Sequence, residues 1–244
     1  MNSRWLNVLV VVFVMAIIPG CVVSKGFDRG SLRQSVQPPA TDKEIQAVFD
    51  LKPQLPVPFK LGVYLAPGGS NWRRAYWSNE EVNALLAYGD QLKDAGIVSD
   101  VRLVSDFTVE VRKPPTFFGY SGSSLKDLRL AAARHGVDAL LIVNSVSAVD
   151  RYNNPAALLY WTIVGLYVAP GTHSDALVMI SGSLWDVRNE FLYATEEAEG
   201  LAKRVGPSQL LEDVPTIDQA KQKAIVEFGR KFTGRLKSLH VKTE

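Results

Sequence analysis

Few side chains in this sequence could support catalysis or metal binding, and they do not form a complete motif. Ser121 lies in the run Gly-Tyr-Ser-Gly-Ser at 119–123, which misses the G-x-S-x-G spacing of a hydrolase nucleophile by one position. His173 and Asp175 could touch one metal ion, but two ligands do not complete a site. We therefore expect no catalytic residues and no metal. A hydrolase that uses Ser121 or His173 is the alternative.

The remaining candidates have structural interpretations. His135 closes a predicted helix, where a cation interacts favourably with the helix dipole, and His240 lies near the end of the sequence, where we expect it to be solvated. The Gly-Gly-Ser turn at 68–70 follows a predicted strand, but it lacks the Lys-Ser/Thr of a phosphate-binding loop. No cofactor is therefore expected.

The single cysteine carries the clearest chemical signal. Arg4 precedes an apolar segment, Leu6–Ile18, which is shorter than the roughly 20 residues needed to span a bilayer. Gly20 and Cys21 follow. This order resembles the lipobox of bacterial lipoproteins, in which the chain is cut before a cysteine that carries a diacylglyceryl thioether. The sequence predicts a signal peptide at 1–20 and lipidation of Cys21. A soluble secreted protein with an incidental cysteine is the alternative.

The residues after the cysteine predict where the protein is sorted and how it is tethered. Lipoproteins of this kind stay in the inner membrane when Asp follows the cysteine, whereas here the residue is Val22. We expect an outer-membrane anchor facing the periplasm, held by two or three acyl chains; two are enough for stable anchoring. Residues 21–58 are rich in Pro, Gly and Ser, which is typical of a flexible tether, with a short helix within 42–51.

Composition narrows the class of protein. The chain has 244 residues, of which 47% are hydrophobic, enough to form a core. Its formal net charge is +2, which gives no sign of a nucleic-acid partner. One cysteine excludes a framework of disulfides. One folded domain is predicted, over residues 59–244.

The pattern of that domain predicts an α/β fold. Strands are expected at 60–65, 98–104 and 138–143, and each of the first two crossovers contains an amphipathic helix. The first helix follows a capping box formed by Ser78 and Glu81, and the second follows Ser124 with Asp127 three residues on. Two βαβ units in series imply a parallel core in a two-layer or three-layer domain.

A β-hairpin and a long helix complete the predicted domain. Residues 176–187 and 191–198 alternate around a turn at 188–189, which favours an antiparallel pair at a sheet edge. A capping box at Thr216 and Gln219 then predicts an amphipathic helix that ends near Leu239 and covers the sheet. A helix lying on a membrane surface is the alternative for this segment.

An uncharged insertion at 155–171 interrupts these strands. Residues 156–169 contain no charged side chain and lie between Pro155 and Pro170. The segment either packs into the core of its own domain or contacts a membrane or partner. The aromatic side chains Tyr160, Trp161 and Tyr167, with Leu166, suit a membrane interface. We predict a hydrophobic excursion off the sheet with part of its surface exposed.

A second aromatic cluster follows the first strand. Trp72, Tyr76 and Trp77 flank Arg73-Arg74. This cluster is interpreted either as an ordered loop or as a contact surface, since Trp and Arg are common at the energetic centres of interfaces.

Three runs of residues resemble a known family. They are LRLAAARHGVDALLIV at 128–143, Pro-Gly-Thr at 170–172 and Leu-Trp-Asp-Val-Arg at 184–188. Together with the lipobox they are similar to rhombotarget lipoproteins, a family named for its occurrence with the intramembrane protease rhombosortase. The order of elements also resembles the TolB N-terminal and CsgG/LpoB type of envelope domain. The resemblance brings no catalytic residues.

These observations predict a non-enzymatic, lipid-anchored protein that acts by binding. We expect an accessory factor in cell-envelope assembly or protein sorting, whose partner is another envelope protein. Self-assembly into a homo-oligomer is a further alternative. The residues expected to form the contact are Trp161, Tyr160, Leu166, Tyr167, Trp72 and Trp77.

Overall fold

The computed structural model describes residues 42–67, 77–105 and 124–241. It divides into two units, one ending at Ala47 and the other beginning at Val48. Helix α3 (Asp42–Phe49) spans this division, as the sequence predicted for residues 42–51.

The second unit is built on one mixed five-stranded sheet with the order β2-β1-β3-β4-β5. β1 pairs in parallel with β2 and β3, and β3, β4 and β5 are antiparallel. This arrangement confirms the predicted α/β fold. The elements are β1 (Phe59–Leu65), α4 (Asn79–Asp94), β2 (Val98–Leu103), α5 (Leu125–Arg134), β3 (Ala139–Asn153), the 3₁₀ helix η2 (Pro155–Trp161), α6 (Ile163–Val168), β4 (Thr172–Asp186), β5 (Leu192–Gly206) and α7 (Val214–Val241).

The two crossover helices begin where their caps predict. The Ser78 hydroxyl accepts the backbone N–H of Glu81, and the Glu81 carboxylate accepts that of Ser78, which confirms the capping box before α4. At α5 the Ser124 hydroxyl accepts the backbone N–H of Asp127. Each cap satisfies donors that the first helical turn leaves unpaired, a contribution of roughly 1 kcal/mol.

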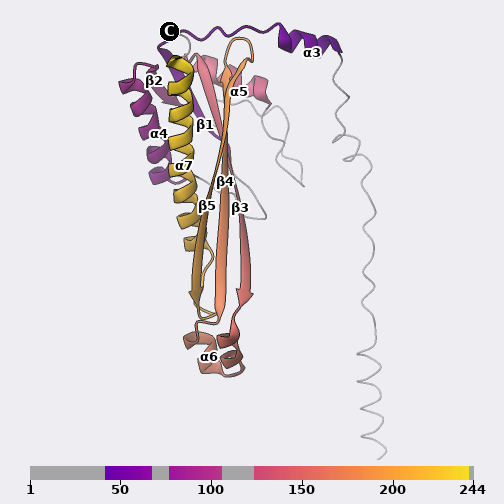
Figure 1. Cartoon of the computed structure of the whole chain (residues 1–244), viewed down its shortest axis with the longest axis vertical. Coiled ribbons are helices and arrows are strands. Elements are labelled where there is room, and N and C mark those ends of the chain that lie inside the picture. Colours follow the sequence, from indigo (N-terminus) through magenta and orange to yellow (C-terminus); the bar gives the residue numbers. More distant parts are fainter. Residues whose placement is uncertain (1–41, 68–76, 106–123, 242–244) are drawn as a thin grey trace, which may run out of the picture. The chain divides into compact units, whose positions relative to one another are not determined.

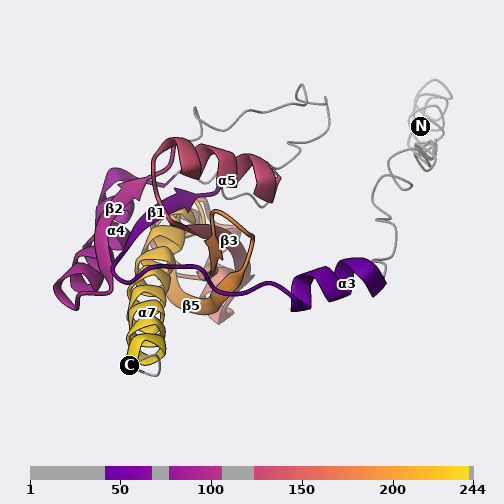
Figure 2. The same ribbon diagram turned by 90° about the horizontal axis from the view of Figure 1, so that it is seen from above.

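Helices cover both faces of the sheet at the end where β1 and β2 lie. The larger hydrophobic cluster joins the sheet to α4 and α7 and includes Leu92, Ile180 and Phe228. The smaller cluster lies under α5 and includes Leu128 and Leu140. Figure 2 shows α4 and α7 on one side of the sheet and α5 on the other. Each fully buried side chain of this size contributes about 1.5–3 kcal/mol.

Helix α7 lies very close to strand β5. Ala198 and Ala202 of β5 are buried, and Gly200 between them faces the helix backbone. A Cβ atom on Gly200 would overlap the carbonyl oxygen of Ala220 and lie 2.6 Å from the amide nitrogen of Ala224. The absence of a side chain at Gly200 therefore sets how closely the helix packs on the sheet.

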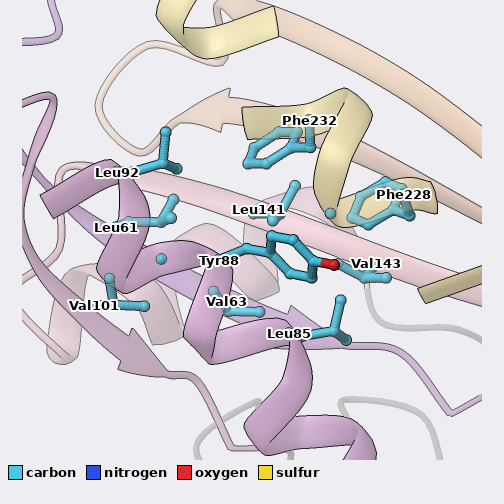
Figure 3. Close-up of a pocket in the computed structure, with 12 residues that line it drawn as sticks. Leu61, Val63, Leu85, Tyr88, Leu92, Val101, Leu141, Val143, Phe228 and Phe232 are labelled. Carbon is cyan, nitrogen blue, oxygen red and sulfur yellow. The ribbon is translucent and has the colours of Figure 1, made fainter. Parts of the chain in front are cut away.

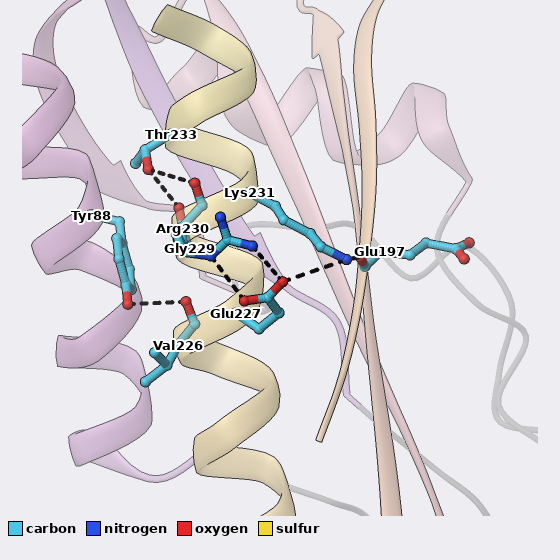
Figure 4. Close-up of polar contacts among 8 residues, drawn as sticks. All are labelled: Tyr88, Glu197, Val226, Glu227, Gly229, Arg230, Lys231 and Thr233. Carbon is cyan, nitrogen blue, oxygen red and sulfur yellow. Dashed lines mark hydrogen bonds and ion pairs between the residues drawn. The ribbon is translucent and has the colours of Figure 1, made fainter. Parts of the chain in front are cut away.

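Lysine side chains of α7 also reach the carbonyl groups of this edge strand. Lys223 donates to the Leu201 carbonyl at 2.9 Å, and Lys231 donates to the Glu197 carbonyl at 3.0 Å, as Figure 4 shows for Lys231. β5 is an edge of the sheet, so these ammonium groups occupy acceptors that another strand would need.

The predicted start of α7 is wrong by three residues, because Thr216 was expected to cap the helix and to lie just before it. The helix begins at Val214, so Thr216 lies in its first turn, fully buried, and its hydroxyl has no partner among the described residues. The Asp213 carbonyl accepts the backbone N–H groups of Thr216 and Ile217 instead. Pro215 is compatible with this position, because the first turn of a helix does not need its N–H groups.

The chain enters the domain at the turn between β4 and β5. The Tyr193 hydroxyl accepts the backbone N–H groups of Gln54 and Leu55, each at 2.9 Å, and donates to the fully buried Asp186 carboxylate at 2.9 Å. Nearby, the Asn189 side chain donates to the Lys52 carbonyl. These bonds attach residues 52–55 to one end of the long hairpin.

Strands β3, β4 and β5 are longer than the sequence indicated. Each has 15 residues, or roughly 50 Å at about 3.4 Å per residue. The apolar run that marks β3 ends at Val143, but its pairing with β4 continues to Asn153. Among the described residues, no helix covers the face of this ribbon opposite α7 beyond α5, so polar and exposed residues can extend the strands here. Figure 1 shows the ribbon extending past α4, α5 and α7.

Candidate functional site

The far end of the ribbon carries two short helices, η2 and α6, which together we call the apolar tip (residues 155–168) (Figure 1). Trp161 is 93% exposed and Ile163 is 80% exposed. This exposure confirms the prediction that the uncharged insertion leaves the sheet and presents hydrophobic surface. The large hydrophobic side chains exposed here are Leu158, Leu159, Trp161, Ile163, Val164, Tyr167 and Val168.

The tip is folded by polar groups that turn inward. The Asn154 side chain accepts the N–H of Ala156 and so caps η2. The Thr162 hydroxyl accepts the N–H of Gly165 at the start of α6 and donates to the Leu159 carbonyl at 2.9 Å. The polar groups that define the two helices are therefore used within the tip itself.

Gly165 allows the two helices to pack on one another. A Cβ atom at this position would overlap the carbonyl group of Leu159 in η2. The residue is buried although most of its neighbours in α6 are exposed. The apolar surface thus rests on one backbone contact that only glycine permits.

Tyr160 joins the tip to the strands. Its ring is half-buried, and its hydroxyl lies 2.9 Å from the Thr172 hydroxyl and 3.3 Å from the Ala169 carbonyl. Of the tip residues predicted from sequence, Tyr160 therefore supports the tip, Leu166 is half-buried, and Trp161 and Tyr167 are exposed.

The loop between β5 and α7 adds a residue that sequence reasoning missed. The Gln209 backbone N–H donates to the Leu166 carbonyl, which places this loop against α6. The next residue, Leu210, is 62% exposed. The sequence signal was the apolar pair Leu210-Leu211 between Pro207 and Glu212. The structure buries Leu211 and leaves Leu210 at the surface.

His173 and Asp175 lie on one face of β4 near the tip, but they do not form a catalytic pair. The His173 ring stacks on Tyr152 with 4.7 Å between centroids, and its Nε2 lies 3.1 Å from the Asn154 amide nitrogen. Asp175 pairs with Lys203 at 2.9 Å. Its hydrogen bond to Lys203, reinforced by its charge, raises the pKa of that amine. In the described parts of the chain, no three metal-ligating side chains gather at one point.

Trp77 is used inside the domain. Its indole N–H donates to the Ala66 carbonyl at 3.0 Å, and the Lys221 ammonium lies 4.4 Å from its ring centroid. Lys221 is almost completely buried and pairs with Glu81 at 2.6 Å. The other members of that aromatic cluster, Trp72 and Tyr76, lie outside the described residues.

The other predicted residues are placed as follows. His135 follows the last turn of α5, and its carbonyl accepts a hydrogen bond from Arg102. His240 lies in the last turn of α7. Gly20, Cys21, Ser121 and the turn at 68–70 lie outside the described residues.

A small apolar cavity between α4, α7 and the sheet does not suit a ligand. Its volume is about 20 Å³, and its walls include Leu85, Tyr88, Phe228 and Phe232 (Figure 3). The Tyr88 hydroxyl donates a hydrogen bond to the Val226 carbonyl at 3.2 Å (Figure 4). The cavity belongs to the packed core.

Comparisons with known proteins leave family and function open. No family model matches the chain, and neither does any curated protein. A putative neuraminyllactose-binding hemagglutinin homolog from Helicobacter pylori is similar in structure, with 11% identity, a TM-score of 0.43, and coverage of 80% of this chain and 96% of that chain. The LpoB C-terminal domain from Salmonella enterica has 12% identity, a TM-score of 0.29, and coverage of 59% and 82%.

Lipoprotein GNA1162 from Neisseria meningitidis is a further structural neighbour, with 15% identity, a TM-score of 0.28, and coverage of 76% of this chain and 97% of that chain. Bacterial lipoproteins thus recur among the neighbours. At these identities and TM-scores the function has to be argued from the chain's own residues. Among the residues the structure describes, no helix combines the length and hydropathy needed to cross a bilayer.

Proposed function

We propose that this chain is an outer-membrane lipoprotein, anchored through Cys21 and facing the periplasm, that acts as a non-enzymatic accessory factor of the cell envelope. The lipobox order ending in Gly20-Cys21 and the Val22 that follows support the anchor and its sorting. The resemblance of residues 128–143 to rhombotarget lipoproteins supports a role in envelope assembly or protein sorting.

The apolar tip is the observation that carries this proposal. A soluble domain rarely exposes a contiguous group of large hydrophobic side chains unless something binds there. The tip displays such a group at the end of a ribbon roughly 50 Å long, with no charged residue in 152–174. This is the form of a contact surface held away from the body of the domain.

The contacts of the candidate catalytic groups support a role without catalysis. The ring nitrogen of His173 faces an amide, and Asp175 is neutralised by Lys203. Neither residue is placed to activate a nucleophile through the contacts it makes. The protein is therefore proposed to work by binding an envelope component at the tip.

Allele replacement tests this proposal in cells. Trp161→Asp should reproduce the envelope phenotype of the deletion strain, such as sensitivity to detergents, while the protein stays folded, abundant and membrane-bound. Val226→Asp, at an exposed valine on α7, and His173→Ala should both behave as wild type. A Trp161→Asp strain without the deletion phenotype would refute the role of the tip.

The anchor is tested separately with Cys21→Ala. This variant should accumulate as an uncut precursor that does not reach the outer membrane. Normal processing and outer-membrane localisation of the variant would contradict the lipoprotein assignment.

A further inference from the structure

We infer that the occupant of the apolar tip is the interfacial region of a lipid bilayer, and that this bilayer is the one that holds the protein's own anchor. This inference rests on the proposed function and names what the tip contacts. It follows from the exposed side chains, from the polar groups of the tip, from the charges around it and from where the tether joins the domain.

The exposed surface of the tip offers almost nothing to a protein partner's polar groups. Protein interfaces carry about one hydrogen bond per 100–200 Å². Here the side chains of Asn154, Tyr160 and Thr162 bond to groups of the tip and its strands. The tip's remaining side-chain hydrogen-bonding groups are the hydroxyl of Tyr167, 51% exposed, and the indole N–H of Trp161, 93% exposed.

Helical backbone is compatible with insertion into lipid. Groups at the depth of acyl chains must satisfy their hydrogen bonds internally, because no water is available there. η2 and α6 meet part of this requirement. The side chains of Asn154 and Thr162 cap their first turns, the Thr162 N–H bonds to the Leu159 carbonyl, and the Ala169 N–H bonds to the Gly165 carbonyl. Trp161 and Tyr167 are of the types enriched where acyl chains meet head groups.

The charges near the tip indicate a bilayer contact that does not depend on anionic lipid. Residues 152–174 contain no Asp, Glu, Lys or Arg. On either side of this stretch, Arg151 lies 3.5 Å from Asp213, and Lys203 pairs with Asp175 at 2.9 Å. These two cations are matched by carboxylates. The exposed Arg204, in register with Ser174, adds a third cation, and Glu212 beside Asp213 adds a third carboxylate. The charges around the tip therefore balance, so apolar burial supplies the attraction.

The tether is long enough to bring the tip back to the anchoring bilayer. The chain enters the domain at residues 52–55, beside the β4–β5 turn and at the opposite end of the ribbon from the tip. About 30 residues separate Cys21 from Lys52, and eight of them form α3. With the helix at about 1.5 Å per residue and the rest fully extended, they span at most roughly 90 Å. This exceeds the roughly 50 Å of the ribbon. Because the anchor raises the effective concentration of lipid, a weak insertion suffices.

The experiment places a fluorescent label on the tip of the full lipidated chain. Cys21 is the only cysteine, and in the proposed lipoprotein its sulfur is blocked as a diacylglyceryl thioether, so Val164→Cys supplies the reactive thiol for a nitrobenzoxadiazole dye. Val226→Cys on α7 is the matched control, because both valines are largely exposed. The purified proteins are reconstituted into phosphatidylcholine vesicles, with and without phosphatidylglycerol and at low and high salt.

We expect blue-shifted emission at position 164 that is quenched by nitroxide-bearing lipids and shielded from aqueous iodide, and neither effect at 226. Phosphatidylglycerol and salt should not change the result. Adding Trp161→Asp should lower the ratio of docked to undocked label at least tenfold, equivalent to about 1.4 kcal/mol. Adding Val226→Asp should leave the ratio unchanged, and circular dichroism verifies that each variant is folded.

Three results would overturn the inference. The label at 164 could stay accessible to iodide in vesicles, or it could become shielded without lipid as the protein concentration rises. The label could also insert only into added vesicles that carry no protein, and not into the vesicle that holds its own anchor. If the label stays in water while Trp161→Asp still loses function in cells, the lipid contact is wrong and the proposed function stands. If the label is inserted while Trp161→Asp cells behave as wild type, the lipid contact stands and the proposed function fails.

Discussion

Removing the Tyr193 hydroxyl should destabilise the domain and release the tether segment. In Tyr193→Phe the fully buried Asp186 carboxylate loses a donor at 2.9 Å, and the N–H groups of Gln54 and Leu55 lose their acceptor. A hydrogen bond to a charged group contributes about 1.5–3 kcal/mol. The exposed N–H of Gln54 can bond to water instead, and the N–H of Leu55 is only partly buried. We expect a loss of roughly 2–3 kcal/mol, or about 4–12 °C in Tm for a domain of this size.

Alkaline pH provides a second test of the same contact. Burial, followed by the hydrogen bond to Asp186, raises the pKa of Tyr193 above its usual value of 10.0. The folded state therefore holds this proton more tightly than the unfolded state. Its contribution to stability is complete below pH 10 and is lost as pH rises through the folded-state pKa. Tyr193→Phe should therefore lose less stability above pH 10 than wild type does.

The assay is urea unfolding followed by circular dichroism at pH 7 and at pH 10 to 11. Tyr88→Phe is the control, because the Tyr88 hydroxyl makes one exposed hydrogen bond, at 3.2 Å, to the Val226 carbonyl. Its loss should cost about 1 kcal/mol or less. If Tyr193→Phe changes the free energy of unfolding by less than about 0.5 kcal/mol, or follows the wild-type alkaline profile, the proposed attachment of the tether is refuted.

Four further variants test the fold, the first three by thermal unfolding and the last by hydrogen exchange. Gly200→Ala should lower the free energy of unfolding by about 1–3 kcal/mol, because its Cβ requires α7 to move outward. Gly234→Ala, with open space around its Cβ, should raise it by up to about 1 kcal/mol. Equal effects of the two substitutions would contradict the close packing of α7 on β5. Ser78→Ala should lower the free energy of unfolding by about 0.5–2 kcal/mol, because α4 loses the side-chain oxygen that caps its first turn. Gly165→Ala should disrupt the tip and lower protection of its amides from hydrogen exchange, with little change in β1; an unchanged exchange pattern would count against the η2–α6 contact.

Local signals predicted most of the fold. The cap at Ser78, the cap at Ser124 and the apolar runs around Leu61 and Leu141 depend on neighbouring residues, and the structure places them as predicted. Thr216 shows the limit of such signals, because its side chain is buried by tertiary packing and the helix begins before it.

Long-range pairing was not visible in the sequence. The outer half of β3, beyond Val143, is a strand because β4 pairs with it, although its own residues are mostly exposed. The Tyr193 contact joins residues that are 138 or more positions apart. No local pattern encodes such a partner, so the length of the ribbon and the point where the tether attaches required the structure.

The candidate site was predictable in part. The absence of charge at 156–169 predicted an exposed hydrophobic excursion, and the exposure of Trp161 confirms it. The sequence did not show that Tyr160 turns inward, because this follows from its bond to Thr172. It also did not place Leu210 near the tip, since that depends on how the loop after β5 packs against α6.

Photo-crosslinking in intact cells tests most directly whether the apolar tip contacts the lipid bilayer. A photoreactive amino acid replaces Trp161 in one strain and Val226 in another, and the adducts are identified by mass spectrometry after irradiation. We expect phospholipid adducts at 161 and none at 226, where the side chain is exposed on α7, outside the tip. Adducts at 161 that consist only of protein, or equal labelling at the two positions, would contradict this expectation.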